Sequence, residues 1–418
     1  MKRESGRFGN IYSLGVRYVV AILVGVVLLT AGLVLIGEHF LGHLNQAAAS
    51  SQGPQKVRIM ANGDLLYHDL LYMSARKEDG SYDFDENFEY VKPWLAKADL
   101  VIGDFEGTIN PDLPLAGYPL FNAPEEVAPA IKKAGYQVLD LAHNHILDSG
   151  LSGIKSTVKT FDKLGIDTVG VYTKKSRDDS PILIKKVNGV KIAILAYSYG
   201  FNGIEESISQ KDYDATLSDL NEKKMKREIE RAEKEADVTV VMPQMGVEYQ
   251  LQPTEEQVKL YHKMIDWGAD IVFGGHPHVV EPAEVVEKNK EKKLIIYSMG
   301  NFISNQRMET VGELENARWT ERGVLMDVTV LKKDGKTTIE AAQAHPTWVN
   351  RTAKGGQSTE GYPTYLYQTY ILEDFIKGGK YRDRLDAATK DRVDLAYKEM
   401  NEHVGLDWPH SDMTKGNN

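Results

Sequence analysis

Side chains that can bind a metal ion occur in this sequence directly after several short apolar runs. His276 and His278 flank a proline in GGHPHVVEP, and two imidazoles at this spacing suit a transition metal held by neutral nitrogen. Carboxylates follow two earlier runs, Asp64 in NGDLLYH and Glu106 in GDFEG, where Asp104 shares the face of Glu106 if the strand continues. Ordinary turn or capping chemistry would explain each carboxylate alone. Together with the histidines, they predict a metal site.

The stretch AHNHILDSG holds the densest group of such residues, because His143, Asn144 and His145 are consecutive where a strand gives way to a helix. A helix that has begun here places Asp148 three residues beyond His145, where the carboxylate can orient the imidazole and raise its pKa. A histidine of this kind suits a general acid. The alternative is a helix-capping asparagine among surface histidines.

Two further strand ends carry weaker candidates. MPQMGVEY offers Gln244, whose amide oxygen is a poor metal ligand, and Glu248, while YSMGNFI adds Asn301 beside a glycine turn. We assign Glu248 and Asn301 to the wall of the pocket, together with His143. The chain has no cysteine, so any metal must be held by oxygen and imidazole.

A layered α/β fold must position these residues, because short β-rich runs alternate with helical stretches along the chain. In such folds ligands gather where strands end. The expected strands cover 57–60, 100–102, 138–141, 191–196, 238–242, 271–273 and 294–297. The expected helices cover 123–135, 151–164, 221–236 and 254–267. Residues 323–331 and 337–344 predict an antiparallel pair with a turn at Asp334 and Gly335, and a polar helical region is expected over 374–403.

Residues 18–37 predict a transmembrane helix, since twenty uncharged and mostly apolar residues span about 30 Å as a helix. Four basic residues and one acidic residue precede the segment and Glu38 follows it, so the N-terminus is expected in the cytoplasm and the main domain outside the cell. A cleavable signal peptide is the alternative, because small residues occur at 47–49. The predicted organisation is a cytoplasmic segment 1–17, a single membrane span 18–37, a linker 38–56, an α/β domain 57–350 and a C-terminal helical extension with a tail, 351–418.

Composition excludes several classes of protein. A chain of 418 residues with 42% hydrophobic residues can bury a sizeable core, which argues against disorder. Fifty basic residues against 60 acidic ones leave a formal charge of −10 without an extended basic stripe, so nucleic acid is not an expected partner. Without cysteine there is neither a disulfide nor thiol catalysis.

Taken in order, the motifs NHILDSG, GVEY, GHPHVVEP and YSMGNFI resemble the capsule-assembly family of CapA and PgsA. These are proteins of poly-γ-glutamate capsule synthesis and belong to the calcineurin-like metallophosphoesterase superfamily. The resemblance spans residues 56–350, and the N-terminal anchor is similar as well. It implies a four-layer αββα sandwich after an N-terminal transmembrane helix, with two divalent metal ions, Mn, Fe or Zn, at the strand ends.

The resemblance also implies a ligand set for these ions. Asp64 and His278 would hold one ion, and Glu106 would bridge to the other. Asn144 and His276 would hold the second ion. In the superfamily such ions activate water and neutralise charge that develops on a phosphoryl group.

A catalytic acid and three departures complete the comparison with the family. By resemblance, His145 oriented by Asp148 would protonate a leaving oxygen. Leu66 stands where the superfamily normally has a histidine, and Gln244 stands where the family usually presents one. The second metal site would then use a weak amide ligand. His143 stands where the family usually has asparagine.

Three functions are compatible with these residues. The first is a metal-dependent hydrolase or transferase that acts outside the cell on a phosphoester or related envelope substrate. The second is a non-catalytic polymer-binding or export subunit, working with membrane-bound synthesis proteins on an anionic polymer such as poly-γ-glutamate. The third, a surface adhesion or scaffold domain, predicts repeats or a long stalk, which the sequence lacks. A role in capsule or envelope polymer synthesis is favoured.

Overall fold

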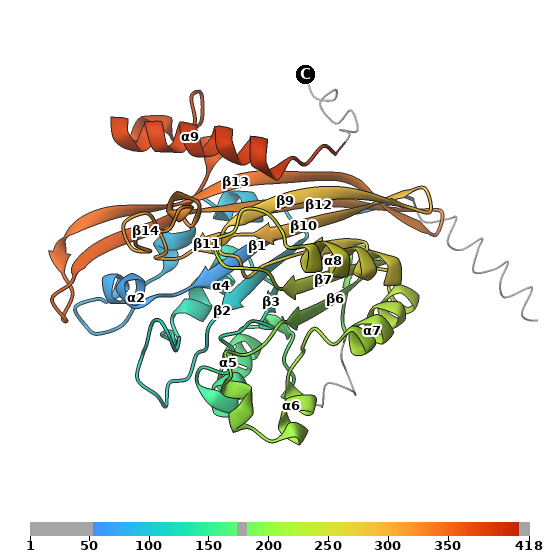
Figure 1. Cartoon of the computed structure of the whole chain (residues 1–418). Coiled ribbons are helices and arrows are strands. Elements are labelled where there is room, and N and C mark those ends of the chain that lie inside the picture. The colour runs from blue at the N-terminus through green and yellow to red at the C-terminus, as the bar shows by residue number, and fades with distance from the viewer. Residues whose placement is uncertain (1–52, 174–181, 409–418) are drawn as a thin grey trace, which may run out of the picture. The chain divides into compact units, whose positions relative to one another are not determined.

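Two mixed β-sheets organise the chain in the computed structural model, which describes residues 53–173 and 182–408 (Figure 1). The first sheet has the strand order β14-β13-β12-β1-β2-β3-β4, and β11 pairs with β1. Its strands are β1 (Gln55–Leu66), β2 (Leu100–Glu106), β3 (Val138–Asp140), β4 (Asp167–Val169), β11 (Asn301–Ile303), β12 (Arg322–Lys333), β13 (Lys336–Gln357) and β14 (Pro363–Ile371). The second sheet has the order β5-β6-β7-β8-β10-β9. Its strands are β5 (Leu183–Val187), β6 (Val190–Ser198), β7 (Val238–Gln244), β8 (Ile271–Phe273), β9 (Val280–Lys288) and β10 (Glu291–Met299).

The helices connect the strands of both sheets. They are α2 (Asp69–Ala75), α3 (Lys92–Leu95), α4 (Val127–Ala134), α5 (Gly150–Lys163), α6 (Gln210–Thr216), α7 (Glu222–Glu235), α8 (Glu255–Trp267) and α9 (Ala387–Val404). Short 3₁₀ turns cover Asp85–Phe88, Ile204–Ser207, Ala317–Trp319, Leu372–Asp374 and Arg382–Arg384. Residues 55–332 and 337–408 belong to one compact unit.

Strand β6 shows why the second sheet is buried on both faces. Side chains alternate along a strand, so Ile192 and Ile194 pack toward the first sheet, whereas Ala193 and Leu195 pack against α7 and α8. Fully burying a side chain the size of isoleucine or leucine stabilises the fold by about 1.5–3 kcal/mol. The near-continuous apolar run of β6 is therefore typical of an inner strand between two layers.

The other face of the first sheet is covered by α4 and α5. Phe105 of β2 meets Phe161 of α5 with ring centres 5.1 Å apart, while Leu100 and Ile102 of the same strand face the second sheet. The two sheets thus pack on each other through one apolar layer, and helices cover their outer faces. The expected α/β class and the two sheets are present.

The C-terminal region differs in part from the expected helical extension. Strand β13 continues to Gln357, and β14 pairs with it antiparallel from Thr347 opposite Ile371. Alternation of apolar and polar residues in PTYLYQTYI explains this strand, which lies at the edge of the first sheet. Helix α9 begins only at Ala387. It packs through Val393 and Ala396 on a cluster around β13 and β14.

The predicted membrane anchor lies outside the described residues. This applies to the segments 1–17 and 18–37 and to most of the linker 38–56. Among the residues that the structure describes, no helix has the length and apolar character needed to cross a membrane.

Candidate metal centre

The carboxyl ends of β1 and β2 and the loop after β8 meet at one place between the two sheets. In the parallel β1–β2 pair, Asp64 lies opposite Asp104, and Leu66 lies opposite Glu106. A glycine is required just before Asp64, because a Cβ at Gly63 would lie 2.1 Å from the carbonyl oxygen of Gly300. The close approach of the chain at Gly300 also lets that carbonyl accept a hydrogen bond from the Asp64 amide at 3.1 Å.

Asp64, Glu106 and His278 form a compact buried group. One ligand atom from each residue lies within 4.8 Å of the others, and all three side chains are buried. His278 Nδ1 is 2.8 Å from Asp64 Oδ2, and its Nε2 is 3.9 Å from Glu106 Oε1. The structure therefore assembles two carboxylates and one imidazole from segments more than 170 residues apart in the chain.

The polar atoms of this group fit a divalent cation. Asp64 Oδ1 and both Glu106 carboxylate oxygens are buried without a hydrogen-bond partner among the described residues. Burial raises the pKa of Glu106 to about 7, although the charge of His278 opposes this shift. Buried carboxylates without partners are costly, and a metal ion bound by oxygen and imidazole would remove that cost. Asp64, Glu106 and His278 thus form a candidate metal site.

The electrostatics of His278 reflect the same surroundings. Burial lowers the pKa of His278, but the negative charges of Glu106 and Asp64 raise it to about 10. Glu248, an exposed residue, adds to this effect. A metal ligand must be the neutral imidazole, so metal binding here would release a proton from His278.

The residues expected to hold a second ion lie around this group. Asn144 Oδ1 and His276 Nδ1 are buried without a partner among the described residues, which is compatible with ligand roles. The ring centre of His276 lies 6.1 Å from that of His278, and His276 stands outside the compact group. Gln244 Oε1 accepts a hydrogen bond from the backbone N–H of Asn144 at 2.8 Å. The amide oxygen predicted as a ligand is thus already used to hold the Asn144 backbone.

His145 and Asp148 form the expected pair. His145 Nδ1 is 2.8 Å from Asp148 Oδ2, and the same carboxylate oxygen accepts the backbone N–H of Phe121 at 2.6 Å. Burial lowers the pKa of His145, but the hydrogen bond with Asp148 and the negative charges of Glu106 and Asp148 together raise it above the ordinary histidine value. Asn202, which the sequence did not single out, lies 3.4 Å from His145 Nδ1 and 3.2 Å from the Asn144 amide nitrogen.

His143 and Asn301 serve the backbone around the site. His143 Nε2 accepts the N–H of Gly107 at 3.3 Å, and burial pushes the pKa of His143 well below its ordinary value. Its neutral ring therefore supports the turn after Glu106. Asn301 donates to the carbonyl oxygen of His278 at 3.2 Å and so holds the histidine loop.

The sequence did not reveal a row of three aspartates across the first sheet. Asp64, Asp104 and Asp140 lie side by side on β1, β2 and β3. Burial raises the pKa of Asp140 to about 8, and burial with the neighbouring carboxylates raises the pKa of Asp104 well above its ordinary value. The signal available was the acidic residue that ends the run VLD directly before the AHNH motif.

The fold and the site define an α/β protein with a buried carboxylate–histidine group at the strand ends. Residues 58–306 match the family model of the bacterial capsule synthesis protein PGA_cap, and the chain belongs to this family. The expected resemblance to the CapA family is confirmed. The chain is 34% identical to the capsule biosynthesis protein CapA of Bacillus anthracis over 234 residues. This alignment covers 54% of this chain and 55% of that protein. It is 34% identical over 226 residues to the PGA biosynthesis protein CapA of Bacillus subtilis, covering 53% and 57%. The chain thus matches about half the length of these curated relatives.

Solved structures similar to this chain include two phosphoester-cleaving enzymes. A calcineurin-like phosphoesterase, YfkN from Bacillus subtilis, aligns with a TM-score of 0.43 at 15% identity over 70% of this chain and 90% of that one. A phosphatase from Mycoplasma pneumoniae aligns with a TM-score of 0.42 at 16% identity, covering 70% and 93%.

Proposed function

We propose that this protein acts in the synthesis of a capsule polymer of the poly-γ-glutamate type, and that its metal centre hydrolyses or transfers a phosphoester. The carrying observation is the buried Asp64, Glu106 and His278 group, whose unpartnered carboxylate oxygens call for a cation. Membership in the capsule synthesis family supports the polymer role. The two-sheet fold is proposed to be the four-layer metallophosphoesterase sandwich.

The proposed chemistry assigns separate tasks to the residues of the site. Asp64, Glu106 and His278 would hold a divalent ion such as Mn, Fe or Zn, and a second ion would add Asn144 and His276. Such ions polarise a phosphoryl oxygen and lower the pKa of bound water. The chain itself supplies the proton for a leaving oxygen. His145 carries it at Nε2 while Asp148 holds Nδ1, which keeps the ring oriented and its pKa raised.

A non-catalytic polymer-binding or export subunit is the second candidate, and two residues favour it. Leu66 is a buried apolar side chain at the end of β1 and supplies no ligand. The amide oxygen of Gln244 accepts a hydrogen bond from the backbone N–H of Asn144. Under this hypothesis the pocket binds a ligand without turning it over.

The location and partners are part of the same proposal. The apolar segment 18–37 would anchor the protein in the cell membrane with its N-terminus in the cytoplasm and its main domain outside. Membrane-bound synthesis or export proteins would be its partners, and an anionic polymer or a phosphoester its substrate. The net charge of −10 does not attract a polyanion, so metal ions or local basic residues would have to bind it.

The first test is the metal content of the full-length chain, purified in detergent with Mn, Fe and Zn supplied. Elemental analysis compares the unaltered protein with a His276→Ala and His278→Ala double variant. His262→Ala is the control, because His262 is partly exposed on α8 and pairs with Glu284 rather than with the site. Near-stoichiometric metal in the unaltered protein and the control, but not in the double variant, is expected. Absence of metal from all three would refute the metal-dependent hydrolase and leave the non-catalytic subunit.

A metal-loaded protein is then screened for turnover. Phosphomonoesters, phosphodiesters and lipid-linked phosphates are offered, and His145→Gln is the matched variant that removes the proton donor. Turnover that falls in His145→Gln supports the hydrolase. Metal binding without turnover of any phosphoester would instead support the binding subunit.

A further inference from the structure

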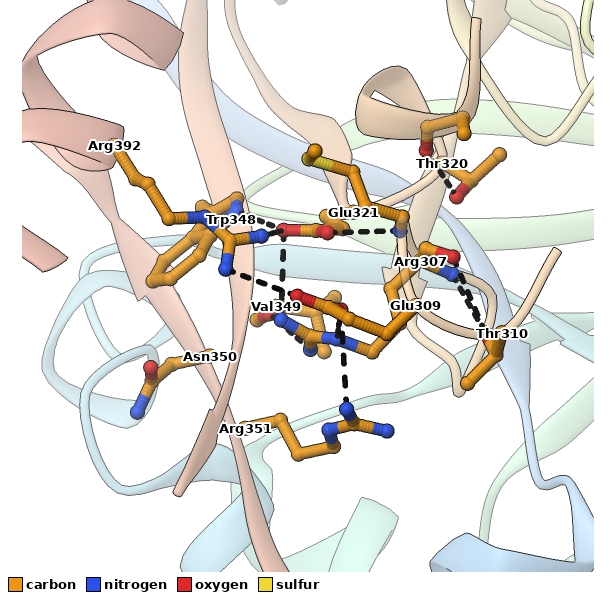
Figure 2. Close-up of polar contacts among 12 residues, drawn as sticks. Arg307, Glu309, Thr310, Thr320, Glu321, Trp348, Val349, Asn350, Arg351 and Arg392 are labelled. Carbon is orange, nitrogen blue, oxygen red and sulfur yellow. Dashed lines mark hydrogen bonds and ion pairs between the residues drawn. The ribbon is translucent and has the colours of Figure 1, made fainter. Parts of the chain in front are cut away.

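A cluster of arginines and glutamates joins the C-terminal helix to the loop that follows β11. This clamp consists of Arg307, Glu321 and Arg392. Arg307 and Glu321 lie near the two ends of loop 304–321, and Arg392 lies on α9. Figure 2 shows Arg392, Arg307 and Trp348 converging on the Glu321 carboxylate. The family match ends at residue 306, one residue before Arg307, so the clamp lies outside the matched region.

Glu321 is the centre of the clamp. Its side chain is 1% exposed, and its Oε2 lies 2.5 Å from Arg392 Nη2, 2.8 Å from Trp348 Nε1 and 3.5 Å from Arg307 Nη2. Its Oε1 accepts the backbone N–H of Met308 at 3.0 Å. A buried carboxylate with this many donors holds a definite geometry, because losing a donor leaves charge uncompensated. The clamp therefore closes the base of loop 304–321.

Arg307 fixes the loop from its other end. It is 3% exposed, donates from Nη1 to the Val349 carbonyl oxygen at 3.3 Å and from Nε to Glu309 Oε2 at 2.7 Å. Its backbone N–H donates to Thr310 Oγ1 at 3.0 Å. Glu309 in turn lies 3.3 Å from Arg392 Nη1, so Arg392 of α9 contacts both Glu309 and Glu321 of the loop.

The closed loop reaches the candidate metal centre through Asn301. The amide nitrogen of Asn301 donates to Gln306 Oε1 at 2.9 Å, to the Thr320 carbonyl oxygen at 2.9 Å and to the His278 carbonyl oxygen at 3.2 Å. Gln306 precedes Arg307, and Thr320 precedes Glu321. Both ends of the loop thus accept hydrogen bonds from the side chain of Asn301, which also contacts the backbone of His278.

Helix α9 also contacts the start of β9, close to His278. His403 Nε2 lies 2.9 Å from the carbonyl oxygen of Val280, two residues after His278. Burial lowers the pKa of His403, so the ring is neutral and can donate this hydrogen bond. Two separate contacts from α9 therefore act on the segment 276–280.

We propose that α9 positions the candidate metal centre. It acts on the backbone of His278 through the clamp and through His403. Neither Arg392 nor His403 touches the site, and both act through other residues. The effect on metal binding rests on the proposed function, whereas the effect on backbone order does not. Outer residues that orient metal ligands typically change metal affinity by about 10–100-fold when they are altered.

The test compares Arg392→Ala and the Arg392→Ala, His403→Ala double variant with Asp394→Asn in the full-length protein. Asp394 is the control, because it also lies on α9 and forms an ion pair with Arg382, 2.7 Å away, but makes no hydrogen bond or ion pair with the clamp in the described part of the chain. Hydrogen exchange of peptides that cover 276–280 reports backbone order without metal. Calorimetric titration with Mn²⁺ alone reports affinity.

Exchange at 276–280 is expected to become about tenfold faster in Arg392→Ala, and faster again in the double variant, with Asp394→Asn unchanged. The Mn²⁺ dissociation constant is expected to rise about tenfold in the same order. Equal exchange rates at 276–280 in Arg392→Ala and Asp394→Asn would overturn the proposal whatever the metal result. Faster exchange in a protein that binds none of Mn²⁺, Fe²⁺ and Zn²⁺ would uphold the positioning role and refute the proposed metal-dependent function.

Discussion

A single methyl group at Gly275 should impair metal binding without unfolding the protein. An alanine Cβ at this position would lie 3.3 Å from Asp104 Oδ2 and 3.8 Å from Asp64 Oδ1. The backbone cannot yield easily, because the Gly275 N–H donates to the Pro243 carbonyl oxygen and the Gly275 carbonyl accepts the Met245 N–H, both at 3.1 Å. The Asp104 carboxylate, which lies beside the ligand Asp64, must therefore move by a few tenths of an ångström, whereas the contact with Asp64 is an ordinary one. Metal–ligand distances tolerate only about 0.2 Å.

The magnitude follows from these two limits. We expect Gly275→Ala to raise the dissociation constant for Mn²⁺ or Zn²⁺ by about tenfold or more, which corresponds to about 1.4 kcal/mol. Gly275 has no positive φ, so without metal the free energy of unfolding of the variant should lie within about 1 kcal/mol of that of the unaltered protein. Calorimetric titration and urea unfolding measure the two quantities. Gly356→Ala is the control, because its Cβ meets nothing closer than Thr364 Oγ1 at 3.5 Å. Unchanged metal affinity in Gly275→Ala would refute the placement of the metal at Asp64, beside Asp104.

Two further predictions concern titration. His345 lies 2.8 Å from Glu373 and 3.5 Å from Asp327, and although burial opposes it, these carboxylates raise the pKa of His345 to about 9. The protonated histidine should thus add about 3 kcal/mol to the free energy of unfolding below pH 6.5, and this contribution should disappear as the pH rises through 9. Urea unfolding of His345→Gln should lack this pH dependence. The same pH dependence in both proteins would contradict the prediction. In the site, Asp148→Asn should lower the pKa of His145, because the hydrogen bond with Asp148 raises that pKa, and NMR titration of the ring should show it. An equal or higher pKa in the variant would exclude Asp148 as the orienting group.

The convergence of Asp64, Glu106 and His278 could be predicted from the sequence for a simple reason. Parallel strands bring their carboxyl ends to the same edge of a sheet, so polar residues directly after apolar runs meet there. The same reasoning paired His145 with Asp148, which are three residues apart at the start of a helix. For His145 and Asp148 the spacing along the chain determines the geometry.

The remaining features depend on register and on distant contacts. Asp64 lies opposite Asp104, and so in line with Asp140, only because the β1–β2 pairing shifts register between Asn62 and Asp64. Periodicity does not fix such a register between strands. The bond between Gln244 and the Asn144 backbone links residues 100 positions apart. Strand β14 follows β13 directly in the chain, and the alternation in PTYLYQTYI could have predicted it. The sequence alone shows which residues can do chemistry, but not which of them form hydrogen bonds with other parts of the protein.

The backbone at the two histidines gives an independent reason to regard this loop as functional. His276 has a φ of 96° and His278 a φ of 58°, a backbone conformation that residues other than glycine rarely adopt. Such conformations cost about 1–3 kcal/mol each and persist only when the surroundings impose them. Here Tyr249 N–H donates to the Pro277 carbonyl oxygen at 2.8 Å, and Asn301 holds the carbonyl of His278. Glycine would relieve both positions, yet the chain keeps imidazoles there. The strain is best explained by the need to place the His278 imidazole against the carboxylates of Asp64 and Glu106 in the opposite sheet.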